Sequence, residues 1–106
     1  MFVSIRTYRI GNGSMDELMH RIDTGIADAF AQEEGFIGYE VAQISERMIV
    51  TVTTFAEPEQ AEASNQLAAE WVAEELPDFA VERVGVVGGE VMVSRAHADM
   101  LVPAHH

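Results

Sequence analysis

Residues 36–55 read FIGYEVAQISERMIVTVTTF, and this stretch decides the fold. Two strand-like runs, 36–45 and 48–55, meet at the short polar segment Ser45-Glu46-Arg47. A parallel connection needs a dozen or more residues, so a segment this short predicts an antiparallel hairpin. The second run is rich in β-branched residues, which suit a pleated sheet. A hairpin of two strands therefore lies near the middle of the chain.

An amphipathic helix is expected before this hairpin. Ser14 is a good N-cap, and Glu17 three residues later completes a capping box. Gly35 is well placed to end the helix. Apolar residues recur at helical spacing on one stripe that would face a core: Met15, Leu18, Met19, Ile22, Ile26, Ala29 and Phe30.

The remaining elements complete a βαββαβ order. Residues 2–10 alternate as a strand does, and a second helix is expected from Pro58 to about Leu76, before Pro77 stops it. A last β-rich region covers residues 81–94, where Gly88-Gly89 indicates a bulge or a tight turn. This order predicts an α+β, ferredoxin-like domain. Two helices cover only one face of such a sheet, so the uncovered apolar face predicts a homodimer.

Length and composition bound the possibilities. The 106 residues suit one domain, expected over 1–95 with a tail over 96–106. There is no cysteine, which excludes disulfides and thiol catalysis. The formal charge of −12, with scattered arginines and no lysine, argues against nucleic acid and anionic membranes. No signal peptide or membrane span is visible, so we expect a cytoplasmic protein.

Two segments carry a family resemblance. Gly35-Phe36-Ile37-Gly38-Tyr39-Glu40 and the stretch 55–61 resemble the antibiotic-biosynthesis-monooxygenase-like family over roughly residues 2–95. Residues 64–72 look like a subgroup of small bacterial proteins without a well-defined activity. The resemblance implies a dimeric α+β barrel. The family includes cofactor-independent monooxygenases of polycyclic phenols, quinol oxidases, haem-degrading enzymes and members of no assigned activity, and fold alone does not choose among them.

The second expected helix carries the first candidate site residues. By helical spacing Ser64 and Asn65 lie on the stripe that faces the sheet, and Trp71 lies at its edge. Such side chains can line a pocket. Alternatively, Ser64 bonds the carbonyl four residues back and Asn65 fixes a loop or strand end.

The strands carry the second group of candidates. Arg6 and Tyr8 share one face of the first strand, and Tyr39 lies on the next strand. On the helix-facing side, these groups would bind a substrate phenolate and stabilise its negative charge. On the other side they would face solvent or the dimer contact, where Tyr and Arg are enriched. Strand parity alone leaves both sides open.

No cofactor or metal is expected. His20 points away from its helix's apolar stripe, His97 follows the last strand, and His105 and His106 end the chain, so all are expected in solvent. Haem degradation in the resembled family implies a first-strand Asn, a second-helix Trp and an axial His. Here Trp71 matches, but Arg6-Thr7 replaces the Asn and no His lies between Trp71 and Arg95.

Three functional hypotheses follow. The first is a monooxygenase-like protein without metal or flavin that binds or oxidises a small phenol- or quinol-type aromatic. The second is a non-catalytic small-molecule-binding or dimeric interaction module. The third, disfavoured by the missing Asn and His, is a haem-degrading enzyme.

Overall fold

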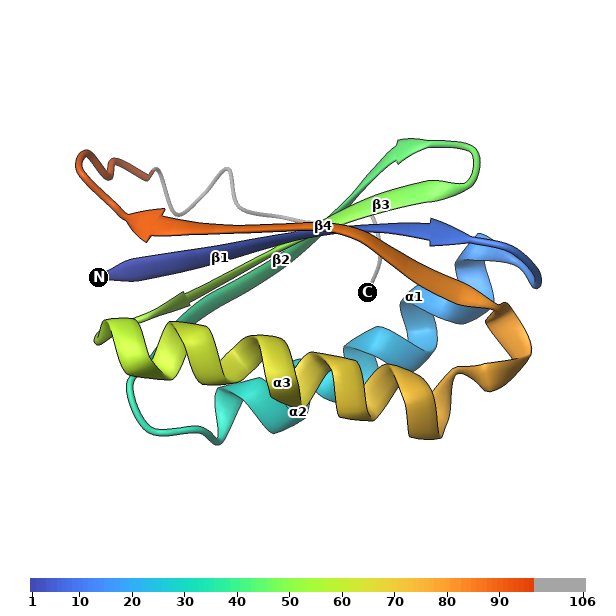
Figure 1. Cartoon of the computed structure of the whole chain (residues 1–106), viewed down its shortest axis with the longest axis horizontal. Coiled ribbons are helices and arrows are strands. Elements are labelled where there is room, and N and C mark those ends of the chain that lie inside the picture. Colours follow the sequence, from blue (N-terminus) through green and yellow to red (C-terminus); the bar gives the residue numbers. More distant parts are fainter. Residues whose placement is uncertain (97–106) are drawn as a thin grey trace.

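A computed structural model describes residues 1–96 of the chain. Two α-helical segments separate the first strand from the hairpin, and a third lies between the hairpin and the last strand (Figure 1). In chain order the elements are β1 (Phe2–Ile10), α1 (Met15–Thr24), α2 (Ile26–Ala31), β2 (Phe36–Ser45), β3 (Met48–Phe55), α3 (Pro58–Glu75), a 3₁₀ turn η1 (Pro77–Phe79) and β4 (Val81–Glu90).

The four strands form one antiparallel sheet in the order β2-β3-β1-β4. The helices lie together on one face of this sheet (Figure 1). This arrangement confirms the predicted α+β, ferredoxin-like βαββαβ fold. The predicted β2–β3 hairpin also forms, and no helix within residues 1–96 is long and apolar enough to cross a membrane.

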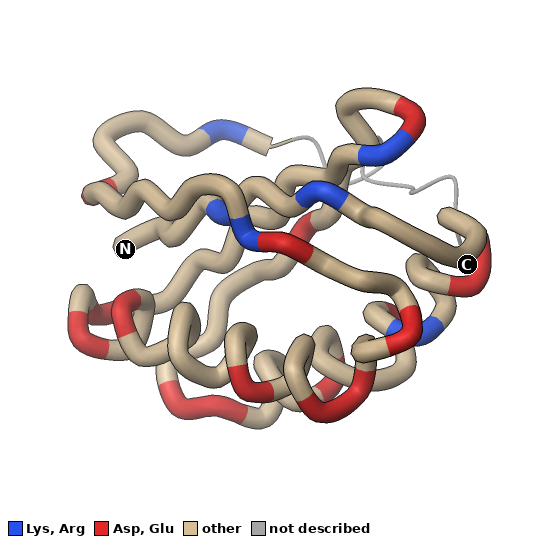
Figure 2. Tube along the Cα trace, turned by 45° about the vertical axis from the view of Figure 1, so that its right-hand side comes forward, with Lys and Arg blue, Asp and Glu red and all other residues tan. Residues whose placement is uncertain are grey.

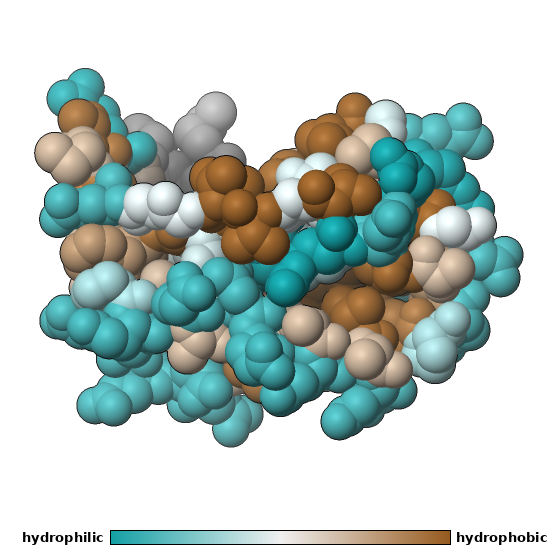
Figure 3. All heavy atoms as spheres, viewed as in Figure 1, coloured by the Kyte–Doolittle hydropathy of each residue, from teal (hydrophilic) through white to brown (hydrophobic). Residues whose placement is uncertain are grey.

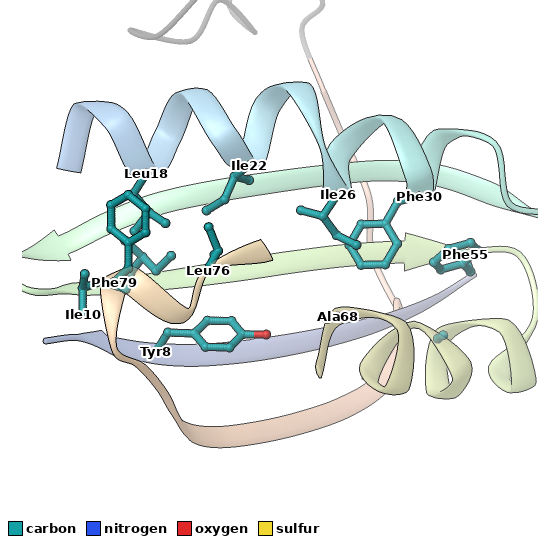
Figure 4. Close-up of a cluster of buried hydrophobic side chains, with 12 residues drawn as sticks. Tyr8, Ile10, Leu18, Ile22, Ile26, Phe30, Phe55, Ala68, Leu76 and Phe79 are labelled. Carbon is teal, nitrogen blue, oxygen red and sulfur yellow. The ribbon is translucent and has the colours of Figure 1, made fainter. Parts of the chain in front are cut away.

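The expectation of one continuous helix before the hairpin is wrong in one detail. The helix breaks at Gly25, which separates α1 from α2. A Cβ atom at Gly25 would lie 2.5 Å from Cζ2 of Trp71 and 2.8 Å from the Arg21 carbonyl oxygen. The absent side chain thus lets the indole of α3 pack directly against the break. The apolar stripe continues across it, because Ile22 and Ile26 are both buried (Figure 4).

The last strand also differs from the expectation. It ends at Glu90 and is one strand, and its irregularity lies at Val84 instead of at the two glycines. Gly88 and Gly89 pair in regular register with Ser4 and Val3. Val84 is the extra residue between the Thr7–Gly85 and Tyr8–Arg83 pairs. The tail predicted from residue 96, with His97, His105 and His106, lies beyond the described residues except for Ala96.

The core lies between the sheet and the helices and has an apolar half and a polar half. Large apolar side chains from α1, α2, β1 and η1 fill most of it, among them Leu18, Phe30 and Phe79 (Figure 4). Polar side chains occupy the part between β1, β3 and the first half of α3. Five polar residues are buried there: Ser4, Arg6, Thr51, Thr53 and Ser64.

Candidate functional site

Arg6 is the centre of the polar part of the core. On β1, Ser4, Arg6, Tyr8 and Ile10 are the buried members of the alternation, so all four point toward the helices. Arg6 is only 1% exposed although it carries a guanidinium group. Arg6 and Tyr8 therefore occupy the helix-facing side, one of the two arrangements that strand parity allowed.

Neutral oxygen atoms surround the Arg6 guanidinium. It donates from Nε to Oγ1 of Thr51 at 3.2 Å and from Nη2 to Oγ1 of Thr53. From Nη1 it donates to Oγ of Ser64 at 3.2 Å and to Oδ1 of Asn65 at 3.0 Å. These bonds join β1, β3 and α3 through one side chain.

No carboxylate within residues 1–96 forms an ion pair with Arg6. The guanidinium carbon instead lies 5.4 Å from the centre of the Phe30 ring, within range of a cation–π contact. Burial lowers the pKa of Arg6, whereas the nearby Tyr8 and Tyr39 act in the opposite direction. Within residues 1–96 the buried positive charge of Arg6 is therefore stabilised by neutral oxygen atoms and by the face of the Phe30 ring, and not by an opposite charge.

Tyr39 lies on β2 across from this charge. Its ring packs on Phe30 with centroids 5.0 Å apart. Burial raises the pKa of Tyr39 well above its usual value, although the Arg6 charge opposes the shift. Tyr39 is therefore a protonated phenol at neutral pH, able to donate a hydrogen bond but not to serve as a base.

Arg6, Tyr8, Tyr39 and Trp71 share one cavity between the sheet and the helices. Its volume is about 20 Å³, room for about one water molecule. The rest of the wall is mostly aliphatic, which makes the surroundings of the charge largely apolar. The other lining residues are Ile10, Leu18, Ile22, Ile26, Ile49, Thr51, Ala68, Val72, Leu76 and Val81.

Ser64 and Asn65 bind Arg6 but do not line this cavity. The Ser64 hydroxyl donates to the Ala61 carbonyl oxygen at 2.6 Å, three residues back instead of the four anticipated. Because its hydrogen is used there, its lone pairs are directed at Arg6. Ser64 also borders a second hollow of about 170 Å³, between α3 and the α2–β2 turn, whose rim carries Glu33 and Glu34. The structure therefore places four of the six candidates around the cavity and the other two, Ser64 and Asn65, in hydrogen bonds to Arg6.

Sequence reasoning missed Thr51 and Thr53. Both are buried on β3 between Ile49 and Phe55, on the helix-facing side of the strand. The two threonines alternate along the strand on the same face as two large apolar residues, Ile49 and Phe55, and this pattern indicates buried hydroxyl groups. Such a pair predicts a polar partner from the layer above.

The described histidine and carboxylates form no evident metal site. His20 lies exposed on α1, as expected from its position off the apolar stripe. Within residues 1–96 no group of three or more His, Asp or Glu residues is placed to hold a metal ion. The second-helix Trp71 likewise has no histidine among the residues that line its cavity.

Neither a protein-family model nor a curated protein matches the sequence. Solved structures do match the fold. A protein of unknown function from Nitrosomonas europaea superposes with a TM-score of 0.70 at 11% identity, over 91% of this chain and 93% of that one. A putative antibiotic biosynthesis monooxygenase from Deinococcus radiodurans superposes with a TM-score of 0.68 at 15% identity, over 92% and 98%.

A dimeric ferredoxin-like protein from an uncultured marine organism also matches, with a TM-score of 0.65 at 13% identity, over 92% of this chain and 100% of that one. The chain has the fold of these proteins. The same scaffold carries proteins of known and of unknown role, so their likeness at such low identity shows fold and leaves activity to the site.

Proposed function

We propose that this protein binds a small phenol- or quinol-type aromatic at Arg6 and promotes its oxidation by dioxygen without metal or flavin. The observation that carries the proposal is the Arg6 guanidinium, 1% exposed and without a carboxylate partner in residues 1–96. It lies on the wall of a largely apolar cavity, beside Tyr8 and Tyr39.

A buried cation without a counter-ion is costly, because hydrogen bonds to neutral groups replace only part of its hydration. An anionic ligand would supply the missing charge. The aliphatic walls and the Trp71 indole favour a flat apolar body on that ligand. A phenolate combines both properties, since it is an aromatic ring bearing one negative oxygen.

The same pair of features supports oxygen chemistry. Arg6 would stabilise the ligand as its anion, and the Tyr39 hydroxyl would donate a hydrogen bond to it. An electron-rich anion can itself reduce dioxygen. A quinol passes two electrons and two protons to dioxygen, giving a quinone and hydrogen peroxide. An anthrone gains one oxygen atom at its CH₂ carbon, and the second oxygen leaves as water with the two hydrogens.

The cavity must enlarge to accept such a ligand, because about 20 Å³ holds no aromatic ring. Trp71 is the side chain best placed to move. It is half-buried, borders the cavity and rests against the Gly25 break between two helical segments. Displacing the indole would open a flat space between α2 and α3.

The small volume of the cavity also favours a second candidate, a binding module without catalysis. It would take up the same class of ligand, with the same displacement of Trp71, and release it unchanged. The two candidates differ only in whether product forms.

A homodimer belongs to the proposal as well. The face of the sheet opposite the helices carries Ile5, Val50, Val52 and Val87, which alternate with residues that face the core. Val87 is 63% exposed. A second copy laid on this face would cover it, and the dimeric ferredoxin-like structure gives a precedent on the same scaffold.

Two measurements test the function. Trp71 is the one tryptophan of the chain, so its emission reports ligand entry directly. We expect a red shift when 2-naphthol or an anthrone is added, and oxygen uptake above the buffer rate with an anthrone or quinol. Emission that changes without oxygen uptake would favour the module. No change in either signal across a panel of such aromatics would refute both.

A further inference from the structure

Arg83 lies next to Arg6 at the junction between β4 and α3. It pairs with Tyr8 across the β1–β4 ladder, and its Nη1 donates to the backbone oxygen of Asn65 at 2.9 Å. The side chain of the same Asn65 accepts from Arg6 at 3.0 Å. Two guanidinium groups therefore meet at one residue of α3, Arg6 from inside the core and Arg83 from the surface.

Neither of these two arginines forms an ion pair with a carboxylate of residues 1–96, whereas two of the other four arginines do. Arg9 pairs with Glu82 at 2.8 Å, and Arg21 pairs with Glu17 and Asp78. No carboxylate in residues 1–96 forms an ion pair with Arg83, although its sequence neighbour Glu82 is acidic. Burial is the main cause that lowers the pKa of Arg6, and the Arg83 charge adds to it. The junction between β4 and α3 thus carries the positive charges of Arg6 and Arg83.

This positive charge stands out against the rest of the molecule. The formal charge of the chain is −12, and acidic residues are spread over the helical layer (Figure 2). An anion approaching the protein is repelled by most of that surface. The β4–α3 junction differs from that surface because two arginines without carboxylate partners in residues 1–96 meet there, and clustered positive charge attracts anionic ligands.

The cavity also runs toward this junction. Its wall includes Ala68 and Val72 of α3 and Val81 of β4, the two elements that border the junction. In the space-filling view hydrophobic atoms are visible between β4 and α3, below hydrophilic side chains (Figure 3). Arg83 does not line the cavity but lies two residues along β4 from Val81, so a ligand that enlarged the cavity toward the junction would bring an edge toward Arg83.

We propose that Arg83 binds a carboxylate on the ligand, so that the ligands of this site are aromatic hydroxy acids. The inference rests on the proposed function: the phenol oxygen meets Arg6, the ring lies against Trp71, and the carboxylate meets Arg83 at the junction. One N–H of Arg83 is held by the Asn65 backbone oxygen. That bond orients the guanidinium, and its other donors can engage a carboxylate.

The competing role for Arg83 is structural, as a clamp that ties β4 to α3. A structural clamp would affect the affinity for every ligand equally, because it would act through the shape of the cavity. A carboxylate contact would support only ligands that carry the acid. A matched pair of ligands separates the two roles.

The test compares 3-hydroxy-2-naphthoate with 2-naphthol, which lacks only the carboxylate, by calorimetric titration of the full chain. We expect the wild type to bind the acid about tenfold more tightly, with the preference shrinking as salt is added. Arg83→Gln should remove the preference and leave 2-naphthol binding within about twofold. Arg9→Gln, which removes an arginine that pairs with Glu82 on the neighbouring strand, should keep the preference.

Four outcomes overturn the inference. If the wild type binds 2-naphthol but does not prefer the acid, or if Arg83→Gln keeps the preference, Arg83 does not bind the carboxylate. If Arg83→Gln weakens both ligands equally while its melting temperature is unchanged, the arginine is a clamp. If neither ligand binds the wild type, the proposed function itself fails. A thermal melt of each variant checks that it is folded.

Discussion

Arg6 Nη1 and Asn65 Oδ1 lie 3.0 Å apart and join the middle of β1 to α3. Because Thr51, Thr53 and Ser64 accept from the same guanidinium, one cation organises a polar seam through the core. Within residues 1–96 no buried side-chain polar atom is left without a hydrogen-bond partner. The polar groups around Arg6 therefore have their hydrogen bonds, but the positive charge of Arg6 has no counter-ion among residues 1–96. The effect of Arg6 on the stability of the fold can thus differ from its effect on the binding of an anion.

Replacing Arg6 by methionine should therefore leave stability intact and abolish binding. A buried charge without a counter-ion carries a large desolvation cost, and an apolar side chain of similar volume removes that cost while it leaves the four accepting oxygens one bond short. We expect Arg6→Met to unfold in urea with a free energy equal to the wild type or up to about 2 kcal/mol above it. The same variant should not respond to 2-naphthol by Trp71 emission.

A loss of stability by Arg6→Met of more than about 2 kcal/mol would show instead that the four hydrogen bonds outweigh the cost of the charge. Ser64→Ala serves as the control. It removes one acceptor of Arg6, keeps the charge, and should weaken binding far less than Arg6→Met does.

The sequence predicted the fold well because each element carries a local signal. The Ser14 cap, the short hairpin connection and Pro58 all act within a few residues of the element they define. The break at Gly25 was not predictable in this way. The backbone leaves helical geometry at Gly25, and the indole of Trp71, 46 positions along the chain, takes the space that a Cβ would need there.

The sequence indicated which residues form the candidate site but not how these residues are arranged in space. Alternation along β1 placed Arg6 and Tyr8 on one face, yet only packing decides which face the helices cover. Ser64 and Asn65 were expected at the sheet-facing stripe of their helix, and both contact Arg6. The absence of an ion-pair partner for Arg6 in residues 1–96 was not predictable, because it depends on which residues of distant elements lie beside Arg6 in the fold.

Substituting Gly25 by alanine should disturb Trp71. The new methyl group would stand 2.5 Å from Cζ2 of the indole and 2.8 Å from a backbone oxygen, so the indole must shift. We expect Gly25→Ala to lose about 1–3 kcal/mol of stability and to show a red-shifted emission maximum. Gly89→Ala is the matched control, because nothing lies within 4 Å of its added Cβ. Equal stability and emission for the two variants would mean that Trp71 does not pack on Gly25.

Alkaline pH should destabilise the protein through Tyr39. Burial raises the pKa of its phenol in the folded state above the ordinary value of 10. The unfolded chain therefore ionises Tyr39 first as pH rises, so the stability it confers is complete below pH 10 and is lost above it. We expect the free energy of unfolding to fall by about 1 kcal/mol per pH unit more in the wild type than in Tyr39→Phe above that point. Parallel pH profiles for the two proteins would contradict the buried, protonated phenol.

A negative charge introduced on the sheet face opposite the helices should dissociate the proposed dimer into monomers. Ile5 lies at the centre of that face, paired with Val52 on one side and Val87 on the other. Two copies related by a two-fold axis would bring two new carboxylates into one apolar contact, which is unfavourable without partners. We expect the wild type to sediment as a dimer and Ile5→Glu as a monomer. Ala73→Glu, which adds the same charge on the exposed outer surface of α3, should remain dimeric. A wild-type protein that sediments as a monomer at micromolar concentration would remove the dimer from the proposal, and a dimeric Ile5→Glu would move the contact to another face.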